Sequence, residues 1–163
     1  MRFVIPKILI FLFTAGIFSF KAVNNKPEAY VNKFSPLAIK LHKETGVPAS
    51  LILGIASVES GYGSSKQSRL LHNHFGMIGG SETGVKKPYN SRYRYFASDE
   101  SCYRAFAKLM VDQYKVPEMV SKGLTVAQIV NKIKKRYAET AYDQWAKDVN
   151  SVIKRRNYLA YDR

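Results

Sequence analysis

The sequence has only one cysteine, Cys102, among its 163 residues. A single cysteine excludes an intramolecular disulfide. Cys102, Phe106 and Leu109 recur at helical spacing, which places them on one face of a helix. This pattern predicts that Cys102 fills a small space in the core, and it favours that role over a nucleophilic one.

Histidines are also few, and they form no recognisable metal-binding motif. The sequence has His42, His72 and His74, of which only the last two are close together. No His-Glu-x-x-His or cysteine-rich pattern accompanies them. We therefore expect neither a metal site nor a cofactor.

Acidic residues are scarce, with 12 Asp and Glu against 26 Lys and Arg and a net charge of +14 at pH 7. Such a surface favours a polyanionic partner, which could be nucleic acid, an anionic membrane or a bacterial wall polymer. The alternative is that the charges only solvate helix faces. The run Lys132, Lys134, Lys135 and Arg136 illustrates this alternative, because it lies largely opposite an apolar stripe.

A long hydrophobic run occurs only near the start of the chain. After Arg2 and Lys7, the residues from Ile8 to Phe20 carry no charge. This run is short for a membrane span, and residues 1–22 are typical of a secretory signal peptide. An uncleaved membrane anchor is the alternative. Either reading places the protein in the periplasm or cell envelope and argues against nucleic acid as its partner. Residues 24–163 are expected to form one monomeric domain.

One carboxylate continues an apolar helical stripe in residues 48–63. At positions i, i+3, i+4 and i+7 this stripe contains Ile52, Ile55, Ala56 and Glu59. Pro48 suits the first turn of the helix, and Gly61 suits the left-handed residue just past its end. Glu59 is therefore expected on the last turn, where the helix can open into a cleft. Apolar walls and the negative end of the helix dipole would raise the pKa of its carboxyl group. A glycosidase general acid needs such a group, although Glu59 could instead be exposed or paired with a basic residue.

Apolar spacing and capping signals predict further helices over residues 30–45, from Ser98 to about 116, after Thr125, and over 141–155. Between the first two of these, residues 78–98 contain Gly, Pro and alternating Tyr and Arg, which predict a small β-hairpin or extended lobe. The sequence thus indicates a mainly α fold with one small β-hairpin lobe.

Four segments then carry a family resemblance. They are residues 46–63 with Glu59-Ser-Gly-Tyr-Gly63, then Asn73-His-Phe-Gly-Met77, Tyr93-Arg-Tyr-Phe-Ala-Ser98 and Arg136-Tyr-Ala138. Together they resemble glycoside hydrolase family 73, the bacterial endo-β-N-acetylglucosaminidases of autolysins and of the flagellar wall hydrolase. The resemblance covers roughly residues 30–158. It implies a lysozyme-like α-domain with a small β-lobe, and cleavage of the peptidoglycan glycan strand after N-acetylglucosamine.

The resemblance also implies roles for individual residues. Glu59 matches the family's catalytic acid, Phe75 and Gly76 match its cleft-lining pair, and Tyr137 matches a tyrosine that assists at the reaction centre. Phe75 and Tyr137 could equally be core aromatics. We expect further substrate contacts from Tyr62, Asn73, Tyr95, Tyr142 and Trp145.

The sequence departs from the family pattern in one respect. Many members carry a second carboxylate shortly before the aromatic-Arg-aromatic segment, whereas residues 86–92 contain none. The nearest upstream acid is Glu82, in a glycine-flanked loop that could close over bound glycan. The alternatives are that Glu82 is inert and that the substrate's acetamido group or Tyr137 assists Glu59. Asp99 and Glu100 are better explained by the N-terminus of a helix.

Three functions remain in competition. A glucosaminidase with Glu59 as general acid is favoured. A lytic transglycosylase or muramidase could use the same fold and a single glutamate. A catalytically weak wall-binding module is the third, and the presence of Glu59 speaks against it.

Overall fold

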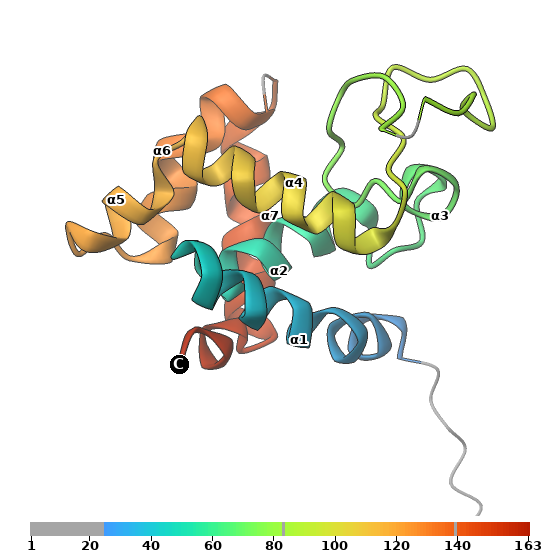
Figure 1. Cartoon of the computed structure of the whole chain (residues 1–163). Coiled ribbons are helices and arrows are strands. Elements are labelled where there is room, and N and C mark those ends of the chain that lie inside the picture. Colours follow the sequence, from blue (N-terminus) through green and yellow to red (C-terminus); the bar gives the residue numbers. More distant parts are fainter. Residues whose placement is uncertain (1–24, 83, 139) are drawn as a thin grey trace, which may run out of the picture.

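The computed structural model describes residues 25–82, 84–138 and 140–163 (Figure 1). The leader expected at residues 1–22 lies outside the described residues. The described chain is mainly helical, with α1 (Lys26–Thr45), α2 (Ala49–Ser60), α3 (Lys66–Leu71), α4 (Asp99–Asp112), α5 (Val116–Ser121), α6 (Val126–Ala138), α7 (Tyr142–Arg155) and the 3-10 helix η1 (Tyr158–Asp162). None of these helices is long and apolar enough to cross a membrane.

Helix α2 lies in the middle of the helical domain, between α1, α7 and η1 (Figure 1). It is apolar on nearly all sides, so it is buried from Ala49 to Ser57. Gly54 allows α7 to approach closely, because a Cβ at this position would lie 2.5 Å from Cγ1 of Ile153. The Asp162 carboxylate accepts bonds from the Ser50 backbone N–H and hydroxyl at 2.8 and 2.6 Å. It thereby satisfies a free N–H at the positive end of α2.

The helix ends follow the capping signals of the sequence. Gly61 ends α2 in the left-handed conformation with φ 55°. The Ser98 hydroxyl accepts from the Ser101 N–H and begins α4. Before α6, the Thr125 hydroxyl accepts from the Gln128 backbone N–H, and the Gln128 side-chain oxygen accepts from the Thr125 backbone N–H. These three predicted boundaries are confirmed because each depends on residues only a few positions apart.

The predicted end of one helix differs from the structure. Helix α4 ends at Asp112 rather than near Val116. The reason is that Lys115 has a left-handed backbone with φ 54°, which turns the chain into α5.

The segment between α3 and α4 forms the expected lobe beside the helical domain (Figure 1). Within its described residues, backbone pairing is limited to isolated bridges between Ile78 and Tyr93 and between Ser81 and Tyr95. The Lys87 ammonium group donates at 2.7 Å to the carbonyls of residues 79, 91 and 93. These three bonds from the partly buried Lys87 hold the carbonyls in place of a regular β-ladder, so the predicted hairpin is irregular.

Candidate active site

A cleft of about 700 Å³ lies where the C-terminal end of α2 meets the lobe and helices α4, α6 and α7. Its walls include Glu59, Phe75, Gly76, Tyr93, Tyr137 and Trp145. The open cleft and its aromatic walls suit a carbohydrate, which packs its sugar faces on aromatic rings.

Glu59 is a partly buried acid in this cleft. It lies on the last turn of α2, and burial raises the pKa of its carboxyl group above the ordinary range. The Trp145 indole N–H donates to Oε1 at 2.7 Å and opposes part of that rise by stabilising the anion. A Cβ on Gly76 would lie 3.4 Å from Oε2, so the glycine leaves the second oxygen uncovered. Burial thus favours the protonated, neutral form of the Glu59 carboxyl group, which lines the cleft where a ligand would bind.

Tyr137 and Phe75 build the wall beside Glu59. The Tyr137 hydroxyl donates to the Phe75 carbonyl at 3.0 Å, and its ring lies 5.0 Å from that of Trp145. Phe75 stacks on Phe106 with ring centroids 3.9 Å apart. Burial, and then the charge of Glu59, raise the pKa of Tyr137 well above its usual value. Tyr137 thus stays neutral and holds the 75–76 segment in place.

The structure brings together five of the residues chosen from the sequence. These are Glu59, Phe75, Gly76, Tyr137 and Trp145. Four expected substrate contacts do not line the cleft, and these are Tyr62, Asn73, Tyr95 and Tyr142.

Each of the four has another observed setting. Tyr62 lines a second cavity behind the cleft. The Asn73 side chain is buried and donates to the carbonyls of residues 77 and 94, because this loop needs an internal partner for its backbone. Tyr95 pairs with the lobe backbone at Ser81, and Tyr142 packs under the Lys135 ammonium group.

Glu82 also lies away from the cleft lining. Its carboxylate accepts from the Ala97 N–H at 2.9 Å and from the Ser101 hydroxyl at 2.8 Å. These bonds lower the pKa of Glu82. Glu82 therefore acts here as a cap for the segment that leads into α4, which explains its position in the lobe without a catalytic role.

Asp148 lines the cleft and was not selected from the sequence. It lies on α7 three residues after Trp145, a spacing that puts both side chains on one helix face. That spacing was the available signal. Asp148 is exposed and accepts from the Gln144 amide at 2.9 Å. Arg92 and Arg94 contribute positive charge to the same cleft.

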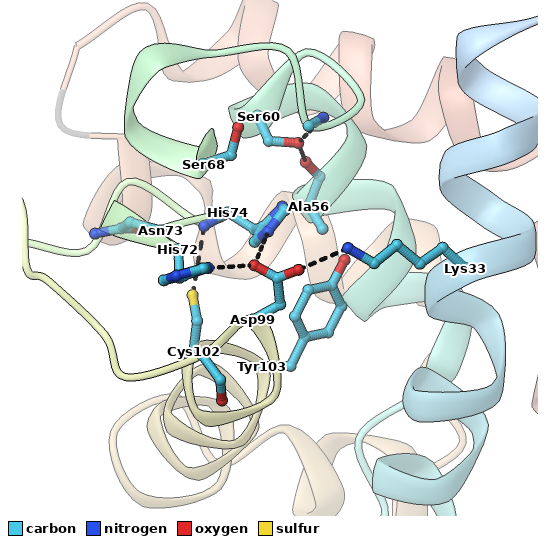
Figure 2. A network of polar contacts seen from close by, with 12 residues as sticks. Lys33, Ala56, Ser60, Ser68, His72, Asn73, His74, Asp99, Cys102 and Tyr103 are labelled. Atoms are coloured by element: carbon cyan, nitrogen blue, oxygen red, sulfur yellow. Dashed lines mark hydrogen bonds and ion pairs between the residues drawn. The ribbon is translucent and has the colours of Figure 1, made fainter. Parts of the chain in front are cut away.

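Asp99 lies at the N-terminus of α4, as expected, and its carboxylate also has side-chain partners from other segments (Figure 2). Its carboxylate binds Lys33 at 2.8 Å, His72 at 2.8 Å and His74 at 3.2 Å. These contacts, the His74 bond first, hold the pKa of Asp99 well below its usual range. The other ring nitrogen of the buried His74 bonds the Tyr30 hydroxyl at 2.9 Å. This network ties α1, the 72–76 segment and α4 together behind the cleft.

Cys102 belongs to the same buried region. Burial raises the pKa of its thiol to about 12, and its sulfur accepts from the His74 N–H. It is therefore a core residue with an unreactive thiol at neutral pH. Among the described residues, no group of His, Cys, Asp and Glu could hold a metal ion.

A partly buried glutamate with a raised pKa at the wall of a helical cleft is an arrangement typical of glycoside hydrolases. Residues 35–158 match the Glucosaminidase family, described as mannosyl-glycoprotein endo-beta-N-acetylglucosaminidase. The match covers most of the sequence, so the chain belongs to this family and is a glycoside hydrolase. A comparison with curated proteins gave no match.

Solved structures share the fold. The catalytic domain of the autolysin Auto from Listeria monocytogenes has a TM-score of 0.72 at 20% identity, over 88% of this chain and 92% of that one. An N-acetylmuramoyl-L-alanine amidase from Staphylococcus aureus has a TM-score of 0.72 at 19% identity, over 85% of this chain but 44% of that one. The glycoside hydrolase domain of FlgJ from Salmonella typhimurium has a TM-score of 0.60 at 20% identity, over 79% and 96%. The lysozyme-like α fold is therefore confirmed.

Proposed function

We propose that this glycoside hydrolase acts on peptidoglycan and cleaves the β-1,4 bond after N-acetylglucosamine in the glycan strand. The observation that carries the proposal is Glu59, a partly buried carboxyl group with a raised pKa at the wall of an open cleft. Membership of the Glucosaminidase family supports hydrolysis at N-acetylglucosamine, and the likeness to an autolysin domain and to FlgJ supports wall glycan as substrate.

In this mechanism Glu59 donates its proton to the glycosidic oxygen as the bond to the anomeric carbon breaks. Water then adds to that carbon and loses a proton to a base, and Glu59 regains its own proton from solvent. Asp148 is the other carboxylate among the described lining residues, so it is a candidate for that base. The alternative is that the acetamido oxygen of the substrate attacks first, with Tyr137 fixing the cleft wall.

The basic surface and the first 22 residues complete the proposal. Peptidoglycan carries acidic peptide stems, so a net charge of +14 would hold the enzyme on the wall. Residues 1–22 would export the chain to the periplasm or cell envelope, either as a signal peptide or as an anchor. The enzyme would act as a monomer.

The test compares Glu59→Gln with Glu82→Gln on a soluble glycan strand. Glutamine cannot donate the proton, so Glu59→Gln should lose about 10²- to 10⁴-fold or more in kcat while glycan binding is kept. Glu82→Gln removes the same group outside the cleft and serves as the matched control. Activity of Glu59→Gln within threefold of wild type would refute the role of Glu59.

Product analysis separates this function from the competing ones. A glucosaminidase leaves a reducing N-acetylglucosamine end, a muramidase a reducing muramic acid end, and a lytic transglycosylase an anhydromuramic end. Since the described lining lacks a second buried carboxyl group, the transglycosylase is the strongest alternative. A protein that binds sacculi but releases no soluble fragments would instead be a wall-binding module.

A further inference from the structure

A second cavity, of about 490 Å³, lies between α1, α3 and the start of α4. It backs onto the active-site cleft, because the same two short segments build a wall of each. In the 59–63 segment, Glu59 lines the cleft and Tyr62 lines the second cavity. In the 72–76 segment, Phe75 lines the cleft and His74 lines the second cavity. A ligand in the second cavity would therefore lie directly behind the catalytic wall.

The rim of this cavity is positively charged. Three cations line it, namely Lys26, Lys33 and Arg69. The carboxylate among the lining residues is Asp99, which forms an ion pair with Lys33 and hydrogen bonds with His72 and His74 (Figure 2). His74 is fully engaged, since its second ring nitrogen bonds Tyr30. Asp99 therefore neither repels an incoming anion strongly nor holds the remaining two cations.

Lys26 and Arg69 are exposed, and no described residue forms a hydrogen bond or ion pair with the side chain of either. They come from α1 and α3, so they face the cavity from two elements. A guanidinium group binds a carboxylate through two parallel hydrogen bonds, and an ammonium group adds a point charge. The rim thus offers two exposed cations to a carboxylate, beside the aromatic side chains of Tyr62 and Phe34. Its volume lies within the range usual for ligand pockets.

We propose that this second cavity binds the free carboxylates of the peptide stems of peptidoglycan, while the glycan strand occupies the active-site cleft. The proposal rests on the proposed function, because the sugars of the strand are neutral and its peptide stems supply the carboxylates. Binding at Lys26 and Arg69 selects strands that still carry their stems, and it lowers KM for them without entering the chemical step.

The experiment measures kcat and KM of the full chain on two substrates. One is a soluble glycan strand with its peptide stems. The other is the same strand after an amidase has removed the stems and the muramic acid carboxylates that this frees have been converted to amides. Wild type should have a lower KM on the stem-bearing strand. The double variant Lys26→Gln with Arg69→Gln should raise KM on that strand about threefold to tenfold, as expected for two exposed ion pairs. Its kcat on both strands and its KM on the stripped strand should not change.

The matched control is Lys122→Gln with Lys132→Gln, which removes two exposed charges that line neither cavity. It should leave the preference for the stem-bearing strand intact. An equal rise in KM for both double variants would show that overall charge, not the cavity, captures the stems, and would overturn the inference. Equal KM values of wild type on the two strands would also overturn it, while leaving the glycosidase function intact. Failure of wild type to cleave either strand would instead refute the proposed function.

Discussion

Replacing Trp145 with phenylalanine should move the pH dependence of the enzyme in a defined direction. The indole N–H is a donor only, and it lies 2.7 Å from Oε1 of Glu59. It stabilises the carboxylate more than the neutral acid, so it holds down a pKa that burial raises. Trp145→Phe keeps an aromatic ring against Tyr137 but removes this donor, so the pKa of Glu59 should rise further.

The size of the shift follows from the strength of the lost bond. A hydrogen bond to a charged group contributes about 1.5–3 kcal/mol, and one pKa unit corresponds to about 1.4 kcal/mol. The expected rise is therefore about one to two units. A general acid works only while protonated, so activity is lost as the pH rises through its pKa. The alkaline limb of kcat/KM should move upward by the same one to two units in the variant.

The assay is kcat/KM on a soluble glycan from pH 4 to pH 9, with the Glu59 carboxyl group followed by ¹³C NMR. Tyr137→Phe is the matched control, because it removes a polar atom beside Glu59 without removing a donor to it. Its alkaline limb should stay where it is in wild type. An alkaline limb in Trp145→Phe that is unmoved, or moved to lower pH, would show that Trp145 does not set the pKa of the catalytic acid.

Three further predictions follow from the same contacts. If Asp148 accepts the proton from water, Asp148→Asn should lower kcat about 10²-fold or more. If Asp148→Asn instead keeps near wild-type turnover while Tyr137→Phe is impaired, the acetamido route is favoured. Asp99→Asn should lower stability at pH 7 by about 2 kcal/mol, or roughly 4–8 °C in Tm. The folded-state pKa of Asp99 is lowered, so its contribution to stability is present above the unfolded pKa near 4 and is lost as the pH falls below that value. The Tm difference between wild type and Asp99→Asn should therefore shrink in acid. Added salt should reduce activity on intact wall more steeply than on a short neutral glycan, since exposed charges are screened over about 10 Å at 0.1 M; equal salt dependence would exclude the basic surface from substrate capture.

The sequence alone determined most of the long helices and the place of the candidate acid. The caps at Gly61, Ser98 and Thr125 depend on backbone bonds that reach only a few residues along the chain, so their residue types specify them. The apolar stripe of α2 and its C-terminal glycine likewise place Glu59 on the last turn of a buried helix. Even the direction of its pKa shift follows from burial, which the stripe predicts.

The tertiary structure decided which side chains meet. The bond from Trp145 to Glu59 joins residues 86 positions apart, and the contact of Glu82 with α4 depends on the path of an irregular lobe. Asp148 and the cations of the second cavity entered their sites only through the packing of separate helices. Local rules fix each helix and its apolar face, but they leave open how the helices pack. Long-range packing therefore placed Asp148 in the cleft and formed the charged second cavity.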